Sequence, residues 1–235
     1  MNAVFPGPAL ATAAQRIEAT LDDVFTAADR LREAVQSIWQ NSAESPVTPA
    51  DLATLQPLIN QTLLDQPHLS GCGFVAELDV LEGPRRYWEW WTPSSEGEAT
   101  TRPLLLRTSE NDASSYAYES MAWFVGARQG ARTVVGPYLD FAGAERFVIT
   151  CAEPVMHNDT FIGVTGADVL VSLLEPIFLG HLRGLDKPCV LINRESRVVT
   201  SNSPEFVPGE RFRADNVDRL PVDTERASWT LCQLT

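Results

Sequence analysis

Between Ala11 and Gln40, apolar residues recur at alternating spacings of four and three. Because side chains three or four positions apart share one face of a helix, this pattern predicts a single long helix with an apolar stripe held for three heptads. The stripe consists of Ile17, Leu21, Val24, Ala28, Leu31, Val35 and Ile38. Two interpretations are open: the stripe packs on its own domain only, or the helix also pairs with a second copy. The second makes a homodimer through this helix the first expected partnership.

The rest of the chain divides into a short second helix and a series of strands. Thr48, with Asp51 three residues later, predicts the start of a helix that runs to Leu64. The Gly71-Cys72-Gly73 cluster is expected to end the helical half. The expected strands are residues 74–80, 86–92, 133–138, 146–156, 161–168, 189–193, 197–201 and 228–234. A short helix capped by Ser114 or Ser115 and a helix over 169–182 lie between them.

Helices followed by antiparallel strands predict an α+β fold rather than a parallel α/β fold. We expect two units in this chain of 235 residues. Residues 1–182 would hold the N-terminal helical segment and the main sheet. Residues 183–235 would form a short C-terminal β subdomain.

Charge and cysteine usage restrict the partners and the compartment. The 18 basic and 31 acidic residues give a net charge of −13, which argues against direct contact with nucleic acid or anionic lipid. We expect no membrane span, because no apolar run of about 18 residues occurs. The N-terminus lacks the pattern of a secretory signal, and the four cysteines lie far apart, so we expect free thiols and a cytoplasmic location. The alternative is an excised extracytoplasmic domain.

The common enzyme signatures are missing from the sequence. It contains no G-x-S-x-G motif, no phosphate-binding glycine loop and no C-x-x-C pair. Its three histidines stand apart from one another and from the cysteines. We therefore expect a protein that is not an enzyme, with no catalytic residues, no metal site and no cofactor.

The aromatic residues are concentrated in one part of the chain. Four of the six tryptophans and all four tyrosines lie between positions 87 and 138. Strand alternation places Trp88 and Trp90 on one face of their strand, and Tyr87, Glu89 and Trp91 on the other. One face can fill the core while the other lines a pocket. Packing alone is the alternative explanation for any single ring.

The segment from Tyr116 to Leu174 resembles the ligand-binding module of Cache (PAS-like) sensor domains. The resemblance rests on the segments Ser-Tyr-Ala-Tyr-Glu-Ser-Met-Ala-Trp-Phe, Val-Gly-Pro-Tyr-Leu-Asp, Thr-Cys-Ala-Glu-Pro-Val and Phe-Ile-Gly-Val-Thr-Gly-Ala-Asp-Val. It implies a PAS-type antiparallel sheet after a long helix that commonly mediates dimers. The C-terminal strands resemble a shortened second module of the double-Cache type. The implied function is non-catalytic sensing of a small molecule.

The resemblance also implies site residues. Amino-acid-sensing members carry a Tyr, an Arg, a Trp, a second aromatic residue and a later Asp, which correspond here to Tyr116, Met121, Trp123, Phe124 and Asp168. Met121 is the departure, because a thioether cannot form the paired hydrogen bonds with which Arg holds a carboxylate. This difference favours a ligand with an amine end over an ordinary α-amino acid.

The chemistry of the candidate residues supports the same ligand class. A desolvated ammonium group needs hydrogen-bond acceptors and a counter-charge, and ring faces attract it further. Asp168 is the first candidate carboxylate, although it could instead cap the following helix. Asp140 is the second, with a simple turn residue as the alternative. The full predicted set is Trp88, Trp90, Tyr116, Met121, Trp123, Phe124, Tyr138, Asp140 and Asp168.

Three functions remain open from the sequence. The first is a sensor domain for a small amine or organic cation, signalling through a second copy and then through a separate transcription regulator or transporter subunit. The second is an enzyme with Glu89, Glu119 and Asp168 as acid/base groups. The third is an interaction module that binds a peptide or protein through exposed aromatic residues. If the ligand has a carboxylate, Arg86, Arg107 and Arg128 are the candidates to hold it.

Overall fold

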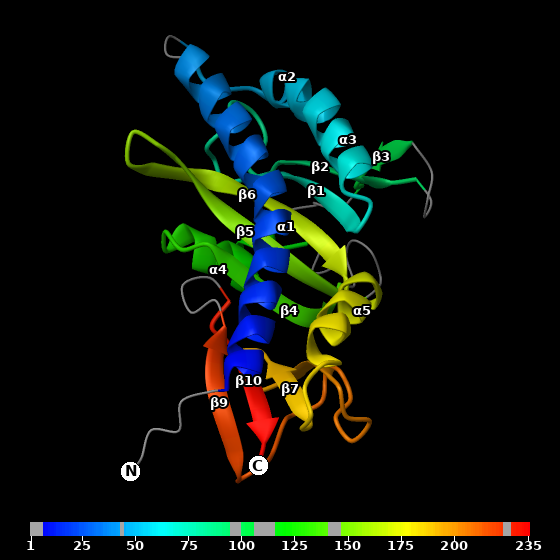
Figure 1. Cartoon of the computed structure of the whole chain (residues 1–235). Helices are drawn as coiled ribbons and strands as arrows, with labels where there is room; N and C mark the ends of the chain where they lie inside the picture. The colour runs from blue at the N-terminus through cyan, green and yellow to red at the C-terminus, as the bar shows by residue number, and fades with distance from the viewer. Residues whose placement is uncertain (1–6, 43–44, 95–99, 106–115, 141–146, 223–226) are drawn as a thin grey trace.

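A computed structural model describes residues 7–42, 45–94, 100–105, 116–140, 147–222 and 227–235 (Figure 1). The helices are α1 (Pro8–Asn41), α2 (Pro49–Leu52), α3 (Gln56–Asp65), α4 (Ala122–Arg128) and α5 (Val171–Leu182), with single 3₁₀ turns at Ala53–Leu55 and Tyr118–Ser120. The strands are β1 (Leu69–Ala76), β2 (Trp88–Pro93), β3 (Thr101–Pro103), β4 (Thr133–Leu139), β5 (Phe147–His157), β6 (Thr160–Leu170), β7 (Cys189–Ile192), β8 (Val198–Ser201), β9 (Val217–Val222) and β10 (Trp229–Leu234).

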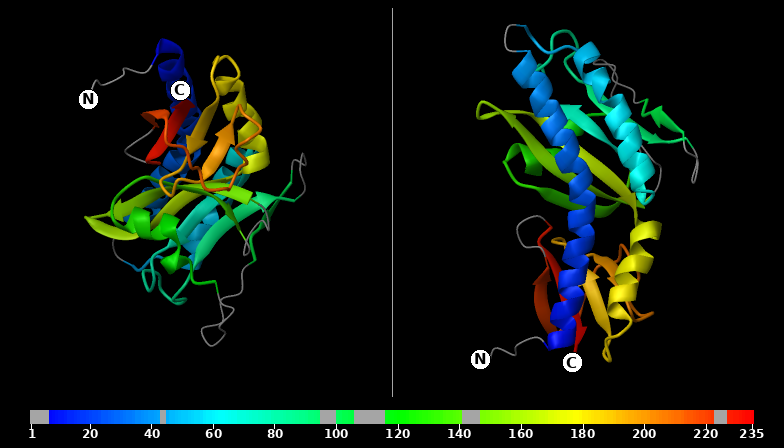
Figure 2. Two further views of the ribbon diagram at one scale, coloured as in Figure 1. Left: turned by 90° about the horizontal axis from the view of Figure 1, so that it is seen from below. Right: turned by 45° about the horizontal axis from the view of Figure 1, so that its top comes forward.

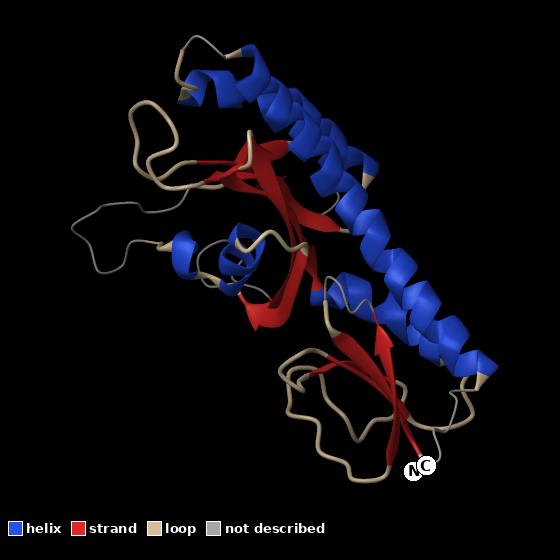
Figure 3. Ribbon diagram, turned by 90° about the vertical axis from the view of Figure 1, so that its left-hand side faces the viewer, coloured by secondary structure: helices blue, strands red, loops and turns tan. Residues whose placement is uncertain are grey.

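The strands form two sheets along one long helix. The larger sheet has the order β3-β2-β1-β6-β5-β4, and the smaller has the order β8-β7-β10-β9; all their pairings are antiparallel. Helix α1, with 34 residues, is about 50 Å long and runs past both sheets (Figure 2). In the side view, α1, α2, α3 and α5 lie on one side of the large sheet and α4 on the other (Figure 3). The α+β fold is confirmed, and the division near residue 182 stays a prediction.

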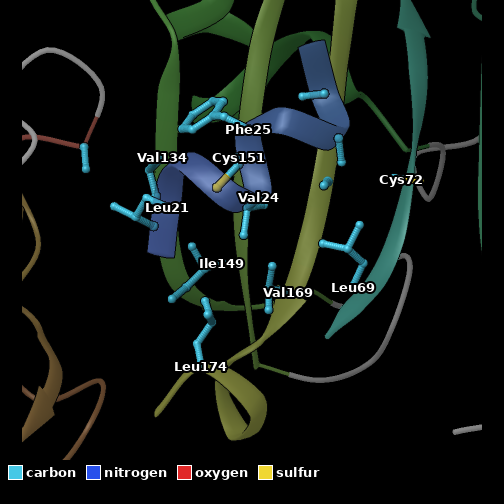
Figure 4. Close-up of a cluster of buried hydrophobic side chains, with 14 of the residues drawn as sticks. Leu21, Val24, Phe25, Leu69, Cys72, Val134, Ile149, Cys151, Val169 and Leu174 are labelled. Atoms are coloured by element: carbon cyan, nitrogen blue, oxygen red, sulfur yellow. The ribbon is translucent and has the colours of Figure 1, made fainter. Parts of the chain in front are cut away.

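The core lies between α1 and the large sheet. Ile17, Leu21, Val24, Ala28, Leu31 and Val35 are fully buried, and Ile38 is partly buried. Figure 4 shows Leu21 and Val24 facing Ile149 and Val169 of the sheet. The apolar stripe thus packs on its own chain and cannot be the surface that meets a second copy. A dimer through α1 stays a prediction, and it would have to use the exposed polar face of the helix.

A group of charged side chains also ties α1 to the sheet. Glu153 of β5 accepts hydrogen bonds or ion pairs from Arg132 (Nη2 to Oε1, 2.9 Å) and Arg32 of α1 (Nε to Oε1, 3.1 Å). Arg132 also reaches Asp29 of α1 at 2.5 Å. Burial raises the pKa of Glu153, and the two arginines act in the opposite direction. Such pairs set the position of a helix more than they add stability, because burying the charges has a cost.

Several parts of the chain differ from the sequence prediction: β1 ends at Ala76 rather than at residue 80, β3 was not predicted, and the second helix is divided by a 3₁₀ turn. Gly71 and Gly73 lie inside β1 rather than before it. They are glycines because the backbone of β2 passes close by: a Cβ on Gly73 would lie 2.0 Å from the Glu89 carbonyl oxygen. Strand β9 falls in a charged stretch that carries no strand pattern. The proposed caps Ser114 and Ser115 lie outside the described residues.

Candidate functional site

A cavity opens on the face of the large sheet that is turned away from α1. Its empty space is about 540 Å³, including the open mouth. Strands supply its floor, and the 3₁₀ turn at Tyr118, the segments around Leu104 and Tyr116, and α4 supply its walls. The lining residues are Val75, Trp88, Trp90, Leu104, Tyr116, Tyr118, Trp123, Tyr138, Asp140, Thr150, Ala152, Val164, Gly166 and Asp168.

Strand alternation sorts the aromatic side chains as predicted. Trp88 and Trp90 point to the cavity face of β2, while Tyr87 and Trp91 pack against the α1 side. The indole nitrogen of Trp88 donates to the Leu104 carbonyl (3.0 Å), which holds this ring at the wall. On β6, Gly166 leaves room beneath Trp90, whose ring atom Cη2 would lie 3.5 Å from an added Cβ. The cavity therefore depends on large rings set above small residues.

A chain of hydrogen bonds fixes the carboxylate of Asp168 in the cavity. Thr150 of β5 and Asp168 of β6 are directly paired across the two strands. The Thr150 hydroxyl donates to Asp168 Oδ1 at 2.5 Å, and Tyr138 Oη lies 2.7 Å from Thr150 Oγ1. The three side chains form a row from β4 through β5 to β6.

Burial and a second carboxylate disfavour the charged form of Asp168. The pKa of Asp168 is raised to about 7, mainly by desolvation; the hydrogen bond from Thr150 acts to lower this pKa, and Asp140 acts to raise it. The pKa of Tyr138 is raised mainly by burial and then by Asp168, and the pKa of Tyr116 by burial and then by Asp140 and Asp168. Both phenols therefore stay neutral near pH 7. The described residues that line the cavity include two carboxylates, Asp140 and Asp168, and no lysine, arginine or histidine.

The raised pKa of Asp168 predicts a pH dependence of stability. The folded state holds the proton up to about pH 7, whereas the unfolded state releases it near 3.8. Folding is therefore favoured by this group below pH 4, and the contribution is lost as the pH rises to 7. Urea unfolding of wild type and Asp168→Asn should show that their difference changes by at most about 1.4 kcal/mol per pH unit between 4 and 7, and is constant above. A difference that does not depend on pH would contradict the shift.

Seven of the nine predicted site residues line the cavity: Trp88, Trp90, Tyr116, Trp123, Tyr138, Asp140 and Asp168. Met121 and Phe124 do not; Met121 precedes α4, and Phe124 is fully buried against Tyr118 and Trp123. The ligand-binding role of each residue stays a prediction. The cap interpretation of Asp168 is wrong, because α5 begins after Leu170, with no side-chain cap.

The other charged candidates lie away from the cavity. Arg86 donates from Nε and Nη2 to the two carboxylate oxygens of Glu119, and Arg128 pairs with Glu77 (Nε to Oε2, 2.6 Å). Glu89 faces the α1 side of β2. There it accepts hydrogen bonds from Tyr87 and Trp91, each 2.6 Å long. The three acids of the enzyme hypothesis are therefore not gathered in one place. Arg107 lies outside the described residues.

The sequence prediction missed Thr150, Tyr118, Leu104 and the small floor residues. Tyr118 donates to the Ala76 carbonyl (2.9 Å) and accepts from the Tyr87 amide (3.3 Å), which locks the turn before α4 onto β1 and β2. Burial raises its pKa to about 12. The sequence could have indicated Thr150, because side chains two residues apart on a strand share a face, and Thr150 therefore lies on the same face of β5 as Ala152.

The described residues show no feature of a metal site or of a membrane span. They contain no group of three His, Cys, Asp or Glu side chains that could hold a metal ion, and none of their helices has the length and apolar character of a membrane span.

Comparison with known families places the cavity in a recognised module. Residues 88–175 match the family model of the first PDC sensor domain of methyl-accepting chemotaxis protein-like proteins. This range contains β2, α4, β4, β5 and β6, which carry most of the cavity. No curated protein sequence matches the chain.

Solved structures share the fold over nearly the whole chain. The ligand-binding domain of the Pseudomonas aeruginosa amino acid chemoreceptor PctB, in complex with L-Arg, is 15% identical with a TM-score of 0.59, over 94% of this chain and 89% of that chain. The ligand-binding domain of the Pseudomonas fluorescens chemoreceptor CtaA, in complex with L-valine, is 15% identical with a TM-score of 0.57, over 94% of this chain and 91% of that chain. The extracellular domain of mmHK1S-Z2, described as a histidine kinase, is 14% identical with a TM-score of 0.65, over 95% of each. The resemblance to Cache (PAS-like) sensor domains is confirmed.

Proposed function

We propose that this chain, which has the fold of Cache-type sensor domains, is a non-catalytic ligand-binding domain whose cavity takes a small organic cation with an amine end. The observation that carries the proposal is the charge of the cavity. Asp140 and Asp168 line it, and no described lining residue is cationic. An anion would be repelled by the two carboxylates there, whereas an ammonium group would be attracted to both of them.

The aromatic walls support the same ligand class. Trp88, Trp90 and Trp123 present ring surface to the cavity, and each cation–π contact contributes about 0.5–2 kcal/mol. PctB and CtaA are described with amino acids bound. Met121 stands here where the resemblance places a carboxylate-binding Arg, and Arg86 and Arg128 are paired elsewhere. We therefore propose an amine rather than an amino acid.

We also propose that the domain works outside the cytoplasm and signals to a partner. The cytoplasmic location expected from the sequence finds no support, because the similar domain of mmHK1S-Z2 is described as extracellular. The four free cysteines do not oppose this, since all are buried and burial raises the pKa of the Cys72, Cys189 and Cys232 thiols. Such thiols resist oxidation, so they do not require a reducing compartment.

A thermal-shift series tests the ligand class with four molecules of similar size: butylammonium, butyltrimethylammonium, 4-aminobutyrate and butyrate. We expect a cation at a hundred times its dissociation constant to stabilise the fold by about 2.7 kcal/mol, which raises Tm by about 5–10 °C in a domain of this size. Butyrate is expected to produce no shift. A shift with butyrate, or with 4-aminobutyrate alone, would contradict the proposed cation site.

A further inference from the structure

The hydrogen atoms in the row Tyr138–Thr150–Asp168 have only one consistent arrangement when Asp168 is ionised. A carboxylate accepts and cannot donate, so the single hydroxyl hydrogen of Thr150 must go to Asp168 Oδ1. Thr150 then has none left for Tyr138. The contact of 2.7 Å between Tyr138 Oη and Thr150 Oγ1 is therefore a hydrogen bond that Tyr138 donates.

This arrangement leaves only acceptors facing the cavity from both ends of the row. Tyr138 has given its hydrogen to Thr150, so its oxygen presents lone pairs. The second carboxylate oxygen of Asp168 accepts no hydrogen bond from any described residue, and Asp168 borders the cavity. A ligand can satisfy both atoms only by donating two hydrogen bonds.

We propose that Thr150 is a positioning residue that makes the cavity select ammonium groups with at least two N–H bonds over quaternary ammonium groups. The inference rests on the proposed cation site and narrows its ligand class. The rings of Trp88, Trp90 and Trp123 attract either kind of cation, so they cannot produce this selectivity. A quaternary group would leave Tyr138 Oη and the second Asp168 oxygen without partners in a desolvated site, which has a high free-energy cost.

Thr150 suits this task because it is fixed on every side. Its side chain is 3% exposed, it lies on β5 between β4 and β6, and it is the direct cross-strand partner of Asp168. The Thr150 hydroxyl accepts a hydrogen bond from Tyr138 and donates one to Asp168. Valine has a similar shape but no hydroxyl, so Thr150→Val removes the group that orients Tyr138 and Asp168 and leaves a side chain of similar size.

Isothermal titration of the series butylammonium, N-methylbutylammonium, N,N-dimethylbutylammonium and butyltrimethylammonium at pH 8 tests the inference. In the wild type we expect butylammonium to bind at least tenfold more tightly than butyltrimethylammonium, with the main loss between the monomethyl and dimethyl forms, where the second N–H disappears. Thr150→Val should weaken butylammonium at least tenfold and change butyltrimethylammonium less than threefold. Thr150→Ser, which keeps the hydroxyl, should retain the wild-type ratio.

The ratio of affinities separates positioning from a general loss of structure, because a damaged cavity would weaken both ligands. Tyr138→Phe tests the same inference without a substitution in β5. It removes one of the two acceptors, so it should also weaken butylammonium more than butyltrimethylammonium. Equal or tighter wild-type binding of butyltrimethylammonium overturns the inference and leaves the proposed cation site standing. A retained ratio in Thr150→Val also overturns it. Binding of no cation by the wild type overturns both the inference and the proposed function.

Discussion

Replacement of Asp168 by Asn is expected to abolish most of the binding of butylammonium while the domain stays folded. Asp168 lines the cavity, and Thr150 and Tyr138 orient its carboxylate. Removing one member of a desolvated charge pair leaves the other without compensation, which costs about 3 kcal/mol or more. This corresponds to a loss of about a hundredfold in affinity by isothermal titration.

Asp159→Asn is the matched control for this variant. Asp159 is an exposed residue of the β5–β6 turn with φ of 61°, a conformation that Asn accepts readily. It makes the same change in net charge outside the cavity, so it should keep the wild-type affinity. Equal weakening in both variants would attribute the effect to net charge alone. Unchanged affinity in Asp168→Asn would remove Asp168 from the site.

Replacement of Gly73 by Ala is expected to cause the largest loss of stability at a single position of the sheet. A Cβ there would lie 2.0 Å from the Glu89 carbonyl oxygen and 2.8 Å from the Trp90 Cα. Backbone cannot rotate out of the way as a side chain can, so β1 and β2 must separate. We expect the free energy of unfolding in urea to fall by about 3 kcal/mol or more. The shift of β2 would also move Trp88 and Trp90 out of the cavity wall.

Gly180→Ala is the control for Gly73→Ala. It shows whether the loss of stability comes from adding a methyl group anywhere or from adding it at position 73. Gly180 lies in α5, where an added Cβ has no atom within 4 Å. Alanine is favoured over glycine in a helix by about 1 kcal/mol, so this variant should be as stable as the wild type or more stable. If Gly73→Ala unfolds at the same urea concentration as the wild type, the claim that β2 lies too close to Gly73 for a side chain is contradicted.

One irregular pair in the β5–β6 hairpin decides which residue of β5 lies opposite Asp168. At the turn, His157 pairs with Thr160 and Met156 with Phe161. Continuing this register would place Ile149 opposite Asp168. A bulge shifts the pairing by one residue, Val155 then faces Gly163, and Thr150 becomes the partner of Asp168. Gly163 has φ of 149° and a Cβ there would lie 2.4 Å from the Val75 carbonyl oxygen, so the sheet requires a glycine at this point.

The placement of Phe124 outside the cavity lining has a different cause. The sequence pattern treats the residues around Trp123 as one group, but successive residues of a helix point about 100° apart. Trp123 therefore lines the cavity, while Phe124 turns into the cluster behind it. The orientation of α4 on the sheet decides which of the two side chains lines the cavity. This orientation depends on contacts with distant segments and cannot be read from the local sequence.

Periodicity alone determined the long helix and the two faces of β2, because both follow from repeats of 3.6 and 2 residues within one segment. Residue chemistry alone determined the acidic and aromatic character of the candidate site. Only the tertiary structure decided that the α1 stripe is buried within the chain, that Thr150 lies opposite Asp168 on the neighbouring strand, and that the Arg86 and Arg128 side chains pair elsewhere. These depend on register, bulges and the packing of distant segments, which no single segment specifies.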